Sequence, residues 1–100
     1  MRPIHIVTLD KDRPCVIVTR EVVQPFVDRL TVIPVQSQAR GIVSEVTVGP
    51  RNGLDHESVA NVDNIATVRR HQVGRLVGFL LQDQEDDLAR AFVAAFDLDV

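Results

Sequence analysis

The sequence predicts a mainly β fold with helices (α+β), in the form of a small, partly open barrel or curled sheet with one amphipathic helix packed on it. Valine supplies 18 of the 100 residues, while tryptophan and tyrosine are absent, so the core is expected to be β-branched, which favours strands. Short apolar runs alternate with turn-forming residues over the first four-fifths of the chain. Apolar residues at helical spacing occupy its end.

The N-terminal third of the chain predicts a hairpin, a break and a third strand. The predicted elements are strands at 4–9, 15–19 and 30–35, and a turn or short helical detour at 21–28. A polar turn at 10–12 separates the first two strands, and Pro14 opens the second. Pro25 interrupts the detour. Pro34 indicates an edge or a bulge in the third strand, because proline cannot donate a hydrogen bond to a neighbouring strand.

The middle of the chain predicts further short strands joined by turns. The predicted elements are a polar loop at 36–41, a half-buried strand at 42–48, a turn at 49–53, two short apolar segments at 58–62 and 65–68, and a last strand at 74–81. Along the half-buried strand, alternate residues share one face: Ile42, Ser44, Val46 and Val48. The Asn-Gly pair that ends in Gly53 is the strongest turn signal of the chain.

Residues 83–96 predict the helix. Its apolar residues follow the i, i+3, i+4 spacing of one helical face: Leu88, Ala91, Phe92, Ala95 and Phe96. Asp83 is the predicted N-cap, and carboxylates at 85–87 follow in the first turn, where the positive end of the helix dipole favours them. This acidic cluster therefore has a structural explanation.

Length, apolar runs and cysteine content limit the classes of protein to consider. One hundred residues predict a single domain, 1–100, with a thin core that a second copy would usefully extend. No apolar run approaches the ~20 residues that cross a bilayer, and the N-terminus has no long apolar stretch, so we expect a cytoplasmic protein that contacts no membrane. Cys15 is the only cysteine, which excludes an intrachain disulfide and a thiolate metal site, and we expect it to be a small buried hydrophobe.

The charge is unevenly distributed. The net charge of the whole chain is −3, but residues 83–100 carry six acidic residues against one arginine, and residues 1–82 carry a net charge of +2. The basic residues are ten arginines and one lysine, and arginine suits bidentate contacts to phosphate. An excess of two is no basic stripe, so any nucleic-acid site must be local.

Few recognisable catalytic patterns are present. The chain has no glycine-rich phosphate loop, no serine elbow between glycines and no metal-ligand spacing. Its three histidines, His5, His56 and His71, are scattered, so a paired-histidine acid/base site would need the fold to gather them, and otherwise they are surface or partly packed imidazoles. Polar and basic residues remain at predicted strand ends: Arg13, Gln36, Ser37, Gln38, Arg40, Asp63 and Asn64.

Several of these residues have an ordinary structural alternative. Arg13 could form a salt bridge with Asp10 or Asp12. Asp63 could cap a turn, and Arg40 could pair with Glu45.

Six short blocks of residues occur in an informative order. They lie at 12–18, 32–35, 40–46, 53–54, 58–68 and 75–78. The most specific are the Arg-Gly-Ile-Val-Ser-Glu-Val stretch that begins at Arg40 and the Asn-Val-Asp-Asn-Ile stretch that begins at Asn61. The ordered set resembles the MazF/PemK family of toxins over nearly the whole chain.

This resemblance implies an SH3-like β-barrel with a C-terminal amphipathic helix, and a homodimer. It also implies cleavage of single-stranded RNA (mRNA, tRNA or rRNA) without a metal or other cofactor. The ribose 2′-OH would attack the neighbouring phosphate and leave 2′,3′-cyclic phosphate and 5′-OH ends. A cognate antitoxin, whose disordered acidic tail competes with RNA for the groove, would restrain this activity.

The resemblance assigns the residues of the site. The family's catalytic arginine before a proline falls on Arg13, whose planar guanidinium would stabilise the charge of the transition state. The family's second catalytic residue, a threonine or serine, aligns with Gln36, and Ser37 follows one position later. Either Ser37 supplies the hydroxyl after a shift of the loop, or the Gln36 amide donates to the phosphate. Further RNA-binding candidates are Lys11, Gln38, Arg40, Asp63 and Asn64.

Two departures from the family leave other functions open. The loop at 10–12 is short and His5 replaces an aromatic residue, so we expect weak activity or a different sequence preference. One alternative is a non-catalytic binding module on the same scaffold, like related toxins that bind DNA gyrase, although this chain lacks their aromatic C-terminal end. A second is a degenerate toxin that acts by binding proteins, which Gln36 and the short loop favour and the Arg13–Pro14 match opposes.

Overall fold

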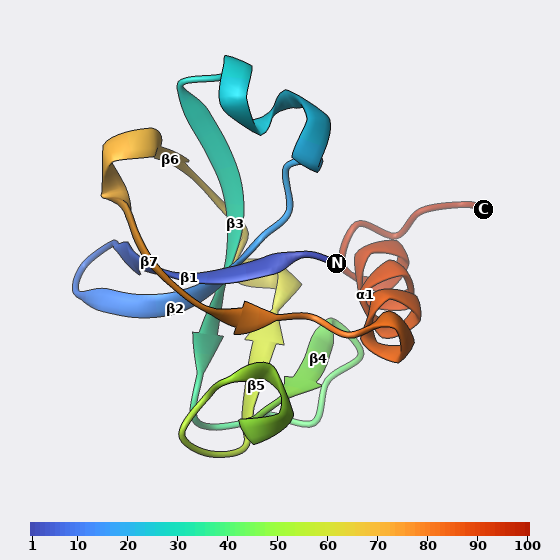
Figure 1. Cartoon of the computed structure of the whole chain (residues 1–100). Helices are drawn as coiled ribbons and strands as arrows, with labels where there is room; N and C mark the ends of the chain where they lie inside the picture. Colours follow the sequence, from blue (N-terminus) through green and yellow to red (C-terminus); the bar gives the residue numbers. More distant parts are fainter.

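The computed structural model describes residues 1–100 as one mainly β structure closed by a helix (Figure 1). Its strands are β1 (Pro3–Thr8), β2 (Asp12–Ile17), β3 (Arg29–Gln36), β4 (Glu45–Val48), β5 (Ser58–Asn61), β6 (Ala66–Arg69) and β7 (Val73–Phe79). The helices are four short 3-10 helices, η1 (Glu21–Phe26), η2 (Pro50–Asn52), η3 (Val62–Asn64) and η4 (Arg70–Gln72), and one α-helix, α1 (Gln82–Ala95). The predicted fold class, with a C-terminal helix, is confirmed.

The sheet is antiparallel, in the order β4-β5-β3-β2-β1-β7, and β3 lies at its centre. One edge of β3 changes partner along its length: residues 29–32 pair with β6, and Val35 and Gln36 pair with β5. Because β3 belongs to both halves, the sheet curls, and in Figure 1 the β1–β2 hairpin and β7 lie across β3. This change of partner carries the end of β3 to the β5 side of the molecule.

Pro34 does not lie in an edge strand, because β3 has partners on both sides, but it lies at a local break in one of these pairings. Pro34 lies opposite Cys15 of β2. On the other edge of β3 it falls in the gap between Val32, the last residue paired with β6, and Val35, the first paired with β5. A residue without an N–H is tolerated there because that stretch of the edge has no strand partner.

Two clusters of buried side chains form the core. The larger one has 11 residues and lies under α1, which contributes Leu88 and Ala91. The smaller one has six residues from β1, β2, β3 and β6, and it includes Cys15, which is fully buried as predicted. Burial raises the pKa of the Cys15 thiol to about 12. No helix of the structure is long and apolar enough to span a membrane.

The strand predicted at 42–48 begins only at Glu45. The Glu45 carboxylate accepts hydrogen bonds from the backbone N–H groups of Arg40 at 2.9 Å and Gly41 at 3.0 Å, and Gly41 takes a left-handed conformation with φ of 73°. The chain therefore turns before the strand, and Ile42 is exposed instead of sharing the buried face. The predicted pairing of Arg40 with Glu45 occurs through the backbone of Arg40, so its guanidinium stays free.

The N-cap of α1 is Leu81 and not Asp83, and the helix begins at Gln82. A leucine cannot cap with its side chain, and the Gln84 side chain accepts a hydrogen bond from the Leu81 N–H at 2.8 Å instead. The buried Gln84 amide also bonds to the amide of Asn52 in η2 and to the Thr47 carbonyl. Asp83 forms a surface salt bridge with Arg51 at 2.8 Å.

The remaining predicted elements are confirmed with shifted ends. The detour is the 3-10 helix η1, and the two short apolar segments are β5 and β6. The tight turn is η2 with Gly53 in the left-handed region at φ of 88°, and a Cβ there would lie 2.3 Å from the Val77 carbonyl oxygen. β2 begins at Asp12, three residues before the predicted strand, and so includes Arg13.

Candidate active site

Two adjoining hollows open where β3 ends and β2 begins. One has a volume of about 220 Å³ and is lined by Lys11, Asp12, Arg13, Pro14, Val35, Gln36, Ser37, Leu54, His56 and Ser58. The other has a volume of about 350 Å³ and is lined by Arg13, Gln36, Ser37, Gln38, Ala39 and Arg40. The fold thus gathers six of the eight residues that the sequence singles out, from the loop before β2, the start of β2, the end of β3 and the loop after β3.

Arg13 lies at the junction of both hollows. It sits at the start of β2, opposite Val7 of β1. Its Nε and one Nη donate hydrogen bonds to the two carboxylate oxygens of Asp10 at 3.1 and 3.2 Å. This contact lowers the pKa of Asp10 to about 2 and raises the pKa of Arg13. Of the two carboxylates offered by the sequence, Arg13 thus takes Asp10, while Asp12 accepts from the Thr8 hydroxyl at 2.8 Å.

The contact with Asp10 leaves much of the guanidinium unused. A guanidinium has five N–H donors, and Asp10 takes two of them, so three remain, two of them on the second Nη. This Nη makes no hydrogen bond within the chain. The remaining donors form a fork of the geometry that binds phosphate or carboxylate through two oxygens.

Gln36 ends β3 and connects it to η3. Its side-chain nitrogen donates to the Gln38 carbonyl at 3.3 Å, and its side-chain oxygen accepts a longer contact from the Asn64 amide at 3.5 Å. Both ends of the Gln36 amide are therefore occupied in the free protein. An amide can donate to a phosphate oxygen, but it cannot take or give a proton at neutral pH.

Ser37, Lys11 and Arg40 present free polar groups to the hollows. The Ser37 hydroxyl is exposed and makes no hydrogen bond within the chain. Lys11 and Arg40 are exposed as well, and neither forms a salt bridge. Together with Arg13 they place three cationic side chains around the two hollows, although the net charge of the chain is −3. The site therefore has a local positive charge suited to an anionic ligand.

Asp63 is held apart from the two hollows. Its carboxylate accepts a hydrogen bond from the Ser44 hydroxyl at 2.8 Å, and its backbone N–H donates to the side chain of Asn61 at 2.9 Å. The turn at η3 is therefore capped by the Asn61 side chain and not by Asp63, as the sequence alternative had it. The neighbouring Asn64 is exposed and reaches the site through its contact with Gln36.

His56 is the lining residue that sequence reasoning missed. The three histidines are indeed not gathered: His5 in β1 contacts the Gly74 carbonyl through Nδ1, and His71 lies in η4. His56, however, lines the same hollow as Arg13. It reaches the hollow because β5, which follows its loop, pairs with the end of β3, and no local pattern in the sequence signals this. Its carbonyl accepts from the Ser58 hydroxyl at 3.1 Å.

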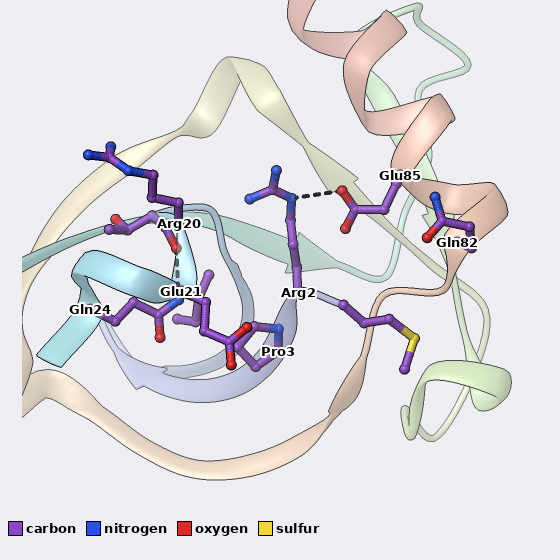
Figure 2. A pocket seen from close by; sticks show the side chains of 10 residues that line it. Arg2, Pro3, Arg20, Glu21, Gln24, Gln82 and Glu85 are labelled. Atoms are coloured by element: carbon purple, nitrogen blue, oxygen red, sulfur yellow. Dashed lines mark hydrogen bonds and ion pairs between the residues drawn. The ribbon is translucent and has the colours of Figure 1, made fainter.

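A hollow of about 330 Å³ lies at the opposite end of the β1–β2 hairpin, between η1 and the start of α1. Figure 2 shows Arg2 and Glu85 pointing toward each other across it, with an Nε to Oε1 distance of 3.1 Å. Arg2 also donates to the Val18 carbonyl at 2.7 Å. These contacts tie the N-terminus to β2 and α1, so the polar groups of this hollow hold the fold together. Nowhere in the structure do three or more His, Cys, Asp or Glu side chains form a group that could hold a metal ion.

The sequence matches a known family and named relatives. The family model that matches residues 7–96 is described as the PemK-like, MazF-like toxin of type II toxin–antitoxin systems. Endoribonuclease MazF3 from Mycobacterium tuberculosis, in strains CDC 1551 / Oshkosh and ATCC 25618 / H37Rv, is 50% identical over 99 residues, which cover 99% of this chain and 96% of the relative.

Solved structures of similar proteins have the same fold. The Mycobacterium tuberculosis toxin MazF-mt6 is 48% identical, with a TM-score of 0.97 over 99% of this chain and 100% of that one. An endoribonuclease from a mycobacterial species, solved in complex with its cognate antitoxin, is 20% identical with a TM-score of 0.86, over 98% of this chain and 94% of that one.

Proposed function

Because this chain belongs to the PemK-like, MazF-like toxins of type II toxin–antitoxin systems, we propose that it cleaves single-stranded RNA without a metal ion. Its endoribonuclease activity follows from 50% identity, over almost the whole chain, to relatives that bear that name. In the proposed reaction the ribose 2′-oxygen forms a bond to the adjacent phosphorus, and the bond from phosphorus to the 5′-oxygen breaks. The products carry 2′,3′-cyclic phosphate and 5′-OH ends.

The observation that supports this reaction most directly is that three of the five N–H donors of the Arg13 guanidinium have no partner in the chain. The crowded phosphorane-like transition state carries more charge on its oxygens than the substrate does, and fixed donors aimed at that charge lower the barrier. Asp10 holds the Arg13 guanidinium from one side and leaves three of its donors free, and Arg13 lines both hollows. Arg13 itself moves no proton, because the Asp10 contact raises its pKa still further.

The other residues of the site bind the substrate in this proposal. The free Ser37 hydroxyl and the second N–H of the Gln36 amide, whose first N–H donates to the Gln38 carbonyl, donate to phosphate oxygens. Lys11, Gln38 and Arg40 contact the RNA backbone along the two hollows. Asn64 reads a base edge, while the Ser44 contact fixes Asp63 beside it.

The proposed partners are a second copy of the chain and a cognate antitoxin. A mycobacterial endoribonuclease of the same fold has been solved with its cognate antitoxin. The cationic side chains around the two hollows would attract an acidic, disordered segment of such an antitoxin as well as RNA. β1 ends at Thr8 and β2 begins at Asp12, so the connecting loop is too short to cover the hollows, and we expect a sequence preference different from that of relatives with a long loop.

The test is cleavage of a long unstructured RNA by the purified chain in the presence of EDTA. Cyclic-phosphate ends at a recurring short motif, lost in Arg13→Ala, support the proposal. A parallel substrate with a single 2′-deoxyribose at the mapped site should remain intact, because the attacking oxygen is missing. Light scattering of the same sample should give the mass of a dimer.

Intact RNA after incubation with folded protein would contradict the proposal. It would favour the non-catalytic alternative, a binding module or degenerate toxin that acts through a protein partner. The occupied amide of Gln36 is the observation that agrees with this alternative.

A further inference from the structure

The hollow of about 220 Å³ that contains Arg13 holds one side chain of the type that exchanges protons near neutral pH, which is His56. The attack of a 2′-OH on phosphate requires a group to take the hydroxyl proton. Among the other lining residues, Arg13 and Lys11 are cations with no lone pair to accept it. Gln36, Ser37 and Ser58 are not bases at this pH.

The two carboxylates near Arg13 are poorly placed for this role. Asp10 is engaged with the Arg13 guanidinium through both oxygens, and the contact lowers its pKa to about 2, which makes it a weak base. Asp12 accepts a hydrogen bond from the Thr8 hydroxyl at 2.8 Å. Asp10 is therefore engaged through both of its oxygens, and Asp12 through one of its two.

His56, by contrast, has an uncommitted ring. Its imidazole makes no hydrogen bond within the chain, and only its backbone carbonyl is used, by the Ser58 hydroxyl. It lies in the loop between η2 and β5, and its exposed side chain is free to adjust to a bound strand. The charged residues around it are Asp55 and Glu57 on its own loop, and Lys11, Asp12 and Arg13 on the facing hairpin.

We infer that His56 is the catalytic base of the proposed cleavage, an inference that rests on the proposed function. The neutral imidazole takes the proton of the 2′-OH, and the 2′-oxygen forms its bond to phosphorus while Arg13 stabilises the phosphate oxygens. The bond from phosphorus to the 5′-oxygen then breaks, and the 5′-oxygen takes a proton from water in the open hollow. The imidazolium returns its proton to the hydroxide so formed, and the residue is neutral again.

The experiment compares His56→Gln with the wild type and with His71→Gln, a histidine in η4 outside the two hollows. The substrate is a short single-stranded RNA that contains the mapped cleavage site. The readout is kcat/KM between about pH 5 and pH 8.5, the range in which histidine titrates. Circular dichroism and thermal unfolding verify that both variants fold.

For the wild type and for His71→Gln we expect kcat/KM to rise with pH along an acid limb. His56→Gln should lose about 100-fold or more in kcat/KM at pH 7.5, as expected for removal of a general base, and should lose that limb. A glutamine retains the size and hydrogen-bonding capacity of the side chain, so loss of the limb reports on proton transfer and not on packing.

Several outcomes would overturn the inference. These are unchanged cleavage by folded His56→Gln, a slower variant that keeps the acid limb, and loss of an alkaline limb in place of the acid one. The failure of the proposed function is a different result, because in that case the wild-type protein itself leaves the RNA intact at every pH.

Discussion

Two arginine–carboxylate pairs, Arg2–Glu85 and Arg13–Asp10, lie at opposite ends of the β1–β2 hairpin. The same type of ion pair has a structural role at one end and a functional role at the other. In each pair the arginine Nε lies 3.1 Å from a carboxylate oxygen. Arg2 pairs with Glu85, 83 residues away, and spends an Nη on the Val18 carbonyl. Arg13 pairs with Asp10, three residues away, and spends its Nη2 on the same carboxylate.

The difference lies in what each guanidinium leaves unused and in what surrounds it. Arg2 connects the N-terminus, the end of β2 and helix α1, so its contacts hold together elements that are distant in sequence. The Arg13 pair is local and connects nothing distant, but Arg13 lines both hollows and its second Nη has no hydrogen-bond partner in the chain. The first pair therefore stabilises the fold, and the second prepares a donor for a ligand.

The largest effect should come from removing the Arg13 side chain. Arg13→Ala should lower kcat/KM for RNA on the order of 10²–10³-fold, because it removes donors aimed at the transition state. Its thermal midpoint should stay within about 2 °C of the wild type, since the pair is exposed and local. Quantified cleavage and a thermal melt of the same preparation provide the measurement.

The matched control for this prediction is Arg2→Ala. Its kcat/KM should stay within about twofold of the wild type, far less than the tenfold change that about 1.4 kcal/mol of activation free energy would cause. If Arg2→Ala lowered cleavage as much as Arg13→Ala, the division between a structural and a functional arginine would be wrong.

For stability we expect the reverse order, with Arg2→Ala more destabilising than Arg13→Ala. Arg2→Ala should lower the free energy of unfolding by about 1–2 kcal/mol, because a charged group's hydrogen bonds to the Val18 carbonyl and to Glu85 are lost. Glu85 Oε2 is buried without a hydrogen-bond partner, so the carboxylate has little else to replace Arg2. Urea unfolding of both proteins measures the difference. Identical unfolding midpoints and slopes would show that the Arg2 pair is not structural.

Removal of the Gln36 side-chain amide, which lines the same hollows as Arg13, should lower RNA cleavage less than Arg13→Ala does. Gln36→Ala removes one neutral donor to the substrate, and we expect kcat/KM to fall by about tenfold or less, in line with a single hydrogen bond. Ser37→Ala should have the larger effect of the two if the Ser37 hydroxyl is the principal donor at this position. Equal loss of activity in both single variants and in the double variant would indicate that they act as one unit.

The smallest effect concerns the pH dependence of the Asp10 pair. Asp10 has a pKa of about 2 in the folded chain against an ordinary value of 3.8, because Arg13 stabilises its charged form. The pair's contribution to stability is therefore fully present above about pH 4 and is lost as the pH falls through about 2. NMR titration of the Asp10 carboxyl carbon should give this low midpoint, and Arg13→Ala should return it to the ordinary range. A midpoint near 3.8 in the wild type would mean that the pair does not persist in solution.

The sequence by itself determined the features that depend on near neighbours in the chain. The alternating and helical spacings fix which segments become strands and helix, and the Asn-Gly pair fixes the turn at Gly53. The salt bridge between Arg13 and Asp10 also lies within one turn of chain, so it was among the two alternatives that the sequence offered. The order of the short motifs was sufficient to identify the family, which residues 7–96 match.

Only the tertiary structure decided the features that depend on partners distant in sequence. Helix α1 begins at Gln82 because Gln84, which accepts from the Leu81 N–H, is fixed by Asn52, 32 residues away. His56 lines the same hollow as Arg13, 43 positions away in the chain, because β5 pairs with the end of β3. Local patterns encode backbone preference and burial, whereas the juxtaposition of two distant side chains depends on how the whole sheet curls.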